Sequence, residues 1–70
     1  MSFCILVIDP DDGEEMYVRH GSVPGEGPIF KYASRDEAQR QVSFMKMGME
    51  EGEDYESISV IPYRKSLEEL

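Results

Sequence analysis

The segment FCILVI, from Phe3 to Ile8, is apolar at every position and rich in β-branched side chains. An uninterrupted apolar run of this length is typical of a β-strand that is covered on both faces. Because successive side chains of a strand point to opposite faces, Ile5 and Val7 share one face with Phe3, whereas Leu6 and Ile8 share the other with Cys4.

A tight turn follows this strand. The segment DPDDG, from Asp9 to Gly13, combines a proline that presets φ with a glycine that supplies positive φ at the exit of a hairpin. From Glu14 to His20 apolar and polar residues then alternate, with Met16 and Val18 on one face. The two segments together predict a β-hairpin.

The middle of the chain predicts a loop and then a helix. Gly21 to Pro28 contains three glycines and two prolines, and Ile29 to Ala33 is a short strand or an extended lead-in. Ser34 and Glu37 form a capping box at the start of the helix. Apolar residues then recur at spacings of four, three and four and form one stripe of an amphipathic helix, which we call the inward stripe because it should face the core. It consists of Ala38, Val42, Met45 and Met49. Gly52 ends the helix, or Gly48 ends it one turn earlier.

The last strand runs from Ser57 to Ile61, with Pro62 at its end or on a sheet edge, and residues 66–70 form one helical turn. The order strand, strand, helix, strand predicts an α+β fold of ββαβ type. We expect one domain over residues 1–70, with an antiparallel sheet of three or four strands and one helix on one face.

The apolar character of both faces of the first strand predicts self-association. One helix covers only one face of the sheet, and small domains gain stability from disulfides, metals or self-association. Cys4 is the only cysteine, which excludes an intrachain disulfide, and no Cys/His cluster suggests a metal site. A homodimer that packs sheet on sheet is therefore expected.

The charge balance limits the classes of partner. Fifteen acidic residues against seven basic ones give a formal net charge of −8. Nucleic acids and anionic membranes repel such a chain, so we expect no direct binding to nucleic acid or to a membrane. The apolar run is too short for a transmembrane span, no signal peptide is recognisable, and a lone cysteine in a strand fits the reducing cytoplasm.

Five carboxylates cluster within seven residues, at Glu50, Glu51, Glu53, Asp54 and Glu56. At a helix C-terminus the macrodipole disfavours negative charge, so this cluster suggests a basic partner or a cation; the alternative is a solvated charge run. Phe44 and Met47 lie off the inward stripe, either exposed or in a helix packed more deeply. With Tyr55 they are candidate apolar anchors for a basic protein surface.

A second set of residues suggests an anionic small ligand. Basic side chains from two copies of the chain, brought together across a dimer axis, would hold a metabolite such as a nucleotide. The candidate residues are Arg19, His20, Arg35, Tyr32 and Tyr63.

The sequence contains no catalytic constellation, so we expect a binding protein without a cofactor rather than an enzyme. The acids around Gly13 do not match an EF-hand, because Ile8 and Arg19 would occupy the first and last ligand positions. Gly25-Glu26-Gly27 lacks the lysine and the strand-to-helix context of a phosphate loop. In size and acidity alone the chain resembles short accessory proteins of phages and mobile elements, including inhibitors that mimic nucleic acid. The resulting expectation is an inhibitor or regulator that occupies a basic surface of a larger protein.

Overall fold

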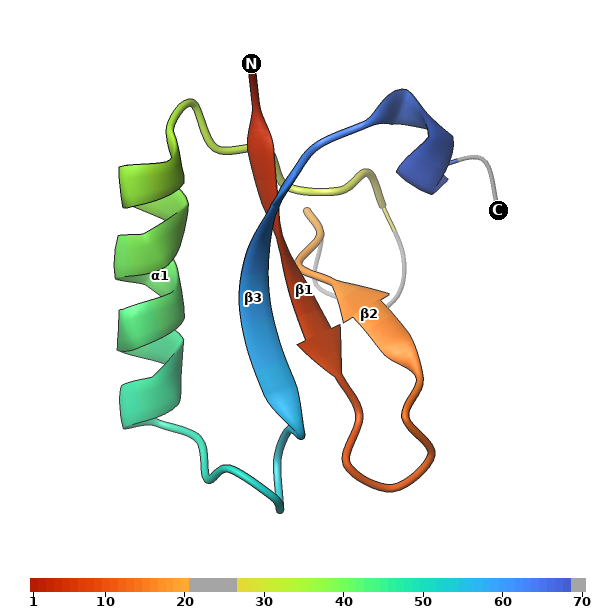
Figure 1. Ribbon diagram of the computed structural model, residues 1–70, viewed down its shortest axis with the longest axis vertical. Coiled ribbons are helices and arrows are strands. Elements are labelled where there is room, and N and C mark those ends of the chain that lie inside the picture. The colour runs from red at the N-terminus through yellow and green to blue at the C-terminus, as the bar shows by residue number, and fades with distance from the viewer. Residues whose placement is uncertain (21–26, 69–70) are drawn as a thin grey trace.

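A three-stranded antiparallel sheet with one helix across it forms the structure, a computed structural model that describes residues 1–20 and 27–68. The elements are β1 (Phe3–Ile8), β2 (Glu15–Tyr17), α1 (Arg35–Met47), β3 (Ser57–Pro62) and a 3₁₀ turn η1 (Lys65–Glu68). The strand order is β2-β1-β3, so the apolar first strand lies in the centre (Figure 1). This architecture confirms the predicted α+β fold. Most of the predicted loop, residues 21–26, lies outside the described residues.

The predicted hairpin joins β1 to β2. Leu6 pairs with Tyr17, and Ile8 pairs with Glu15. In the turn, the Gly13 N–H donates to the Asp9 carbonyl at 3.0 Å, and the Asp9 carboxylate accepts the Asp11 N–H at 2.8 Å. Gly13 has a φ of 74°, as the turn composition predicts.

Substituting Gly13 by valine is expected to destabilise the protein by about 1–2 kcal/mol, because a β-branched residue is strained at positive φ. A Cβ at Gly13 would meet no atom within 4 Å, so the loss does not come from a clash of the Cβ and reports backbone strain. Gly48→Ala is the matched control, since Gly48 has a φ of −105°. Urea unfolding of the two variants measures the difference. Equal stability of G13V and wild type would contradict the turn geometry.

The helix begins where the capping box predicts. The Ser34 hydroxyl accepts the Glu37 N–H at 3.2 Å, and the Glu37 carboxylate accepts the Ala33 N–H at 3.3 Å. Gly48 caps the other end by donating its N–H to the Met45 carbonyl. The helix therefore ends one turn before Gly52, which lies instead in a turn with a φ of 90°.

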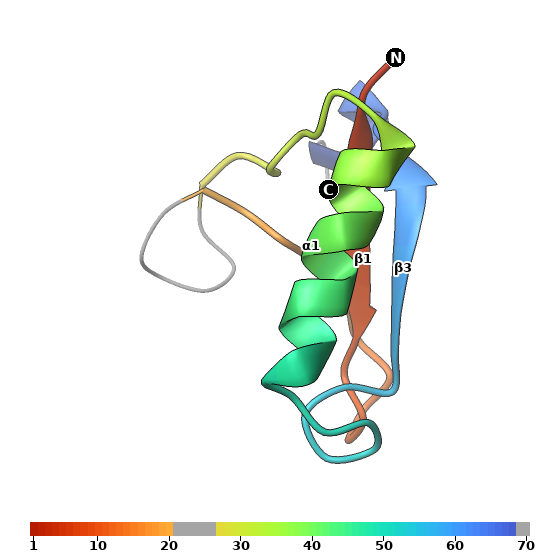
Figure 2. The same cartoon turned by 90° about the vertical axis from the view of Figure 1, so that its left-hand side faces the viewer.

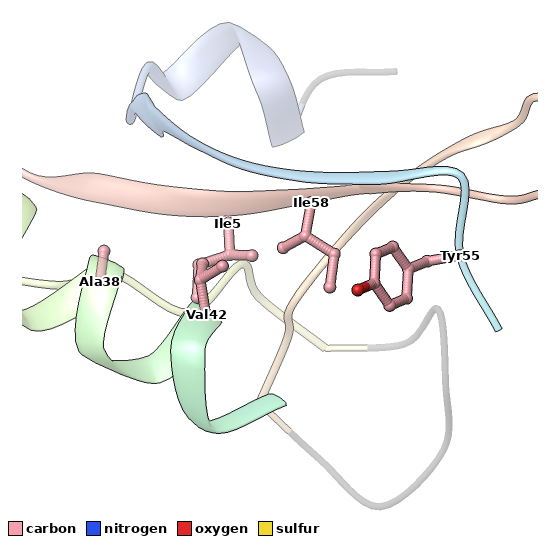
Figure 3. Packing of buried hydrophobic residues seen from close by; sticks show 5 residues of the cluster. All are labelled: Ile5, Ala38, Val42, Tyr55 and Ile58. Carbon is pink, nitrogen blue, oxygen red and sulfur yellow. The ribbon is translucent and has the colours of Figure 1, made fainter. Parts of the chain in front are cut away.

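The core lies between α1 and one face of the sheet. Ile5 of β1 and Ile58 of β3 face Ala38 and Val42 of α1, and Tyr55 closes the end of this layer (Figure 3). Ile5 and Ala38 are completely buried. Each large apolar side chain buried in this way contributes about 1.5–3 kcal/mol, so this layer dominates the stability of the domain.

The second face of the sheet carries Cys4, Leu6 and Ile8, which pair with Ile61, Ser59 and Ser57 of β3. Figure 1 shows η1 on this side of the sheet, opposite α1. The Tyr63 N–H donates to the Ser2 carbonyl at 2.8 Å and so holds the chain after β3 against β1. Cys4 is completely buried within a single chain. Leu6 and Ile8 of the same face are only partly buried, and η1 makes no close contact with β1, so the expected sheet-on-sheet dimer stays a prediction.

Beyond β2 the chain forms an irregular ribbon with the segment that leads into the helix. The His20 N–H donates to the Pro28 carbonyl at 2.9 Å, and the Phe30 N–H donates to the Val18 carbonyl at 2.8 Å. Tyr32 then bridges to Phe3 of β1. Figure 2 shows this ribbon projecting to one side of α1. In the described part of the chain, no helix has the length and apolar character needed to cross a membrane.

Candidate functional site

Two acidic segments that are distant in the sequence meet at one end of the molecule. Figures 1 and 2 both place the β1–β2 turn and the α1–β3 connection at this end. The Glu56 N–H donates to the Ile8 carbonyl at 2.7 Å, which ties the start of β3 to the end of β1. We call residues 9–15 and 50–56 together the acidic pole.

The acidic pole holds most of the negative charge of the chain. Each of its two segments contains five carboxylates and no basic residue. The pole therefore has a formal charge of −10, and because the whole chain has −8, the remaining residues together carry +2. Such segregation of charge produces a directional field that attracts cationic surfaces to one end of the molecule.

Hydrogen bonds within the second segment give its acids different roles. The Asp54 carboxylate accepts the Glu50 N–H at 2.8 Å, and the Asp54 N–H donates to the Glu50 carbonyl, also at 2.8 Å. The Asp54 side chain is therefore engaged in stabilising the turn of residues 50–54. Glu50, Glu51, Glu53 and Glu56 are exposed and available to a partner.

The structure corrects the argument from the helix macrodipole. Glu50 lies beyond Gly48, outside the last helical turn, and that turn carries Lys46. The dipole effect decays within one turn, so the acidic segment does not violate the usual helix-end preference. The convergence of the two segments, rather than a conflict with α1, is what distinguishes this end of the molecule.

The predicted apolar anchors separate into two groups. Tyr55 is only 4% exposed and packs in the core, so it is corrected from an anchor for a partner to a structural residue. Phe44 and Met47 are 71% and 85% exposed on α1. Met47 is the last residue of α1, which ends at the acidic pole (Figure 1). Its exposed apolar surface therefore lies at the same end of the molecule as the acidic pole.

The carboxylates do not form a built metal site. Among residues 1–20 and 27–68, no group of three or more His, Cys, Asp or Glu side chains is arranged to hold a metal ion. Asp9 and Asp12 instead accept the backbone N–H groups of Asp11 and Glu14. A partner that carries several cations suits these spread carboxylates better than one ion does.

Three of the five residues predicted for an anionic ligand lie on one side of the sheet. His20 stacks on Phe30 with ring centroids 4.4 Å apart, and Phe30 lies 4.7 Å from Tyr32. Tyr32 pairs with Phe3, whose ring lies 5.1 Å from the Arg35 guanidinium. We call His20, Phe30, Tyr32, Phe3 and Arg35 the aromatic ledge. Sequence reasoning missed Phe30 and Phe3, although alternation along residues 30–32 indicates that Phe30 and Tyr32 share a face.

Arg19 and Tyr63 do not join the aromatic ledge. Arg19 precedes His20 in the extended ribbon, so the two side chains point to opposite faces. The Arg19 guanidinium donates to the Gly27 carbonyl at 2.8 Å. The Lys31 ammonium lies over the Tyr63 ring at 4.8 Å, which places Tyr63 on the face opposite Tyr32. The Tyr63 hydroxyl donates to Glu68 at 2.6 Å, and this bond raises the tyrosine pKa. A single chain thus offers only part of the predicted ligand set.

Cys4 is expected to react slowly with thiol reagents, because burial both shields the sulfur and raises the pKa of the thiol. The unfolded chain loses this proton first as the pH rises, so folded stability is intact below about pH 8.5 and decreases above it. A colorimetric disulfide reagent should label native protein far more slowly than urea-unfolded protein, and Cys4→Ala should lose the first step of the alkaline decline. Equal labelling rates in both states would contradict the burial of Cys4.

Comparison with known proteins finds no matching family model, no similar curated protein and no similar solved structure.

Proposed function

We propose that this protein is an acidic protein-interaction module, an inhibitor or regulator that occupies a basic surface of a larger protein that handles nucleic acid. The supporting observation is the convergence of two five-carboxylate segments on one pole, joined by the hydrogen bond from Glu56 to Ile8. The mechanism is occupancy. Carboxylates of the pole pair with the lysine and arginine side chains that otherwise hold phosphate groups. The proposed role is binding without catalysis, in the cytoplasm.

Ion pairs alone do not supply the affinity of such a complex. An exposed ion pair contributes about 0.2–1 kcal/mol, so several pairs mainly set the rate and direction of approach. Buried apolar anchors supply much of the remaining affinity in protein interfaces. Met47, and Phe44 one turn before it, provide exposed apolar surface next to the pole.

The test compares two variants with the same net charge. E50Q/E51Q/E53Q removes three charges from the pole, and Q39K/Q41K/S43K adds three positive charges at exposed positions of α1. Tagged wild-type protein and both variants are used to capture partners from the native cell at low salt, with elution by a salt step. The bound protein should be the same for wild type and the α1 variant.

The pole variant should bind that partner about 5- to 150-fold more weakly, which corresponds to about 1–3 kcal/mol for three pairs. Higher ionic strength should weaken the wild-type complex steeply. Equal binding by the two variants would contradict a role for the pole and would leave it as a solvated face.

A second candidate function rests on the aromatic ledge. A row of aromatic rings with a histidine at one end and an arginine at the other is suited to a planar anionic metabolite such as a nucleotide. Under this alternative the protein sequesters or senses the ligand as a homo-oligomer. A thermal-shift screen tests it, since ligand at one hundred times its Kd stabilises the folded protein by about 2.7 kcal/mol. Phe30→Ala should abolish the shift, and Tyr63→Phe should retain it.

A further inference from the structure

The β3 strand forms one edge of the sheet. In the order β2-β1-β3, Ser57–Pro62 pairs on one side with β1 and, within the described residues, has no strand on its other side. Figure 2 shows β3 at the border of the sheet, on the side away from the projecting ribbon. An edge of six residues presents unpaired backbone groups to any strand that approaches it.

The register identifies which backbone groups are unpaired. Tyr63 donates its N–H to Ser2 of the segment that enters β1, so alternate residues from Tyr63 back to Ser57 also point toward β1. Ile58, Val60 and Pro62 therefore point outward. Proline has no N–H to leave unsatisfied, which fits its position on the outward side of an edge strand. The free edge consists of the N–H and carbonyl groups of Ile58 and Val60, together with the carbonyl of Pro62.

This edge lacks most of the features that prevent edge-to-edge pairing. Natural edge strands are protected by charged side chains, bulges or very short length. The six residues SISVIP include no charged side chain, and only the terminal proline disfavours pairing. The opposite edge, β2, has three residues and contains Glu15. The β3 edge is thus the longer and the less protected of the two.

The charges that flank β3 favour one occupant of this edge. The acidic segment of residues 50–56 precedes the strand, and the exposed pair Arg64-Lys65 follows it. When two copies of β3 lie antiparallel, the acidic segment of each copy lies beside Arg64-Lys65 of the other. A parallel arrangement would place like charges together. The flanks are therefore complementary to a second copy of the same strand in the antiparallel direction.

We infer that β3 pairs antiparallel with β3 of a second copy, which joins two three-stranded sheets into one sheet of six strands. A twofold axis near Ser59 places Ile58 of one copy opposite Val60 of the other and satisfies all the free groups of both residues. This edge-to-edge geometry differs from the expected sheet-on-sheet dimer. It is argued from other observations than the proposed function, although its flanks include Glu53 and Glu56 of the acidic pole.

The test exchanges the flanking charges between two variants. R64E/K65E places acids beside the acidic segment of an identical copy, and E53K/E56K places bases beside Arg64-Lys65. All four positions are exposed, so both variants should fold, as circular dichroism will verify. By sedimentation, wild type should be a dimer, and each variant alone should dimerise at least about tenfold more weakly. An equimolar mixture of the two variants should restore a dimer, because both flanks are then complementary.

A control variant and a backbone measurement complete the test. R40E/K46E changes the net charge as much as R64E/K65E does, at exposed positions of α1, and should remain dimeric. Hydrogen exchange should show protected Ile58 and Val60 amides in wild type and exposed ones in R64E/K65E. The inference is overturned if wild type is a monomer up to millimolar concentration, if the mixture does not dimerise, or if these two amides exchange rapidly in the dimer. R64E/K65E keeps every carboxylate of the acidic pole, so partner capture by this variant tests the proposed function separately.

Discussion

Ile5→Asp is expected to prevent folding, whereas Leu6→Asp, one residue further along the same strand, yields a folded but less stable protein. Ile5 is completely buried beneath α1, among Val42, Ile58 and Tyr55. An aspartate there is an unpaired buried carboxylate and also removes apolar packing, at a cost of several kcal/mol. A domain of this size has about 3–5 kcal/mol of stability from its core, so the folded state is lost.

Leu6 lies on the second face, where it is only partly buried between Tyr17 and Ser59. An aspartate at this position retains access to water, so we expect a decrease of about 1–3 kcal/mol with the fold intact. Ser43→Asp, at an exposed position of α1, is the control and should change stability little. Circular dichroism and urea unfolding measure all three variants. If I5D folded and L6D did not, the assignment of the two faces would be wrong.

Gly27→Ala is expected to open the ribbon between the end of β2 and the segment before α1. A Cβ at Gly27 would lie 2.1 Å from the His20 carbonyl oxygen, and the residue has a φ of 84°. The clash involves backbone on both sides, so no side-chain rotation relieves it. Backbone strain of about 1–2 kcal/mol and displacement of about 1–3 kcal/mol combine to a loss of roughly 2–5 kcal/mol.

Gly52→Ala provides the matched control for this effect. Gly52 has a φ of 90°, but an added Cβ would meet nothing within 4 Å, so this variant should show the strain without the clash. In Gly27→Ala, rapid hydrogen exchange at the His20 and Phe30 amides and loss of the His20–Phe30 stack should accompany the lower stability. Identical stability and exchange in the two alanine variants would contradict the close approach of Gly27 to His20.

Local signals in the sequence predicted the parts of the fold that depend on neighbouring residues. The hairpin follows from Pro10 and Gly13, whose dihedral preferences suit the turn, and the helix start follows from Ser34, whose hydroxyl caps Glu37. The end of the helix was ambiguous because Gly48 and Gly52 are both compatible with a cap. Packing decides between them, since Tyr55 must reach the core beside Ile58.

Features that depend on contacts distant in the sequence were predicted less well. The acidic segment of residues 50–56 was evident, but its meeting with residues 9–15 depends on the pairing of β1 with β3. Tyr55 was misassigned because an aromatic residue among carboxylates looks exposed until the chain direction is known. Periodicity identified both apolar faces of β1, but it did not indicate that Cys4 is completely buried in a single chain while Leu6 and Ile8 of the same face are only partly buried.

The central position of β1 has a consequence for how the chain folds. Its two neighbours come from very different distances along the sequence: β2 follows directly, whereas Pro62 of β3 pairs with Phe3 across nearly the whole described chain. Pairing between such distant residues requires closure of a long loop and is slow. On a chain emerging from the ribosome, β1 therefore waits with one edge open until the helix and the last strand have been synthesised. During that interval its apolar residues are available to chaperones and to other nascent chains.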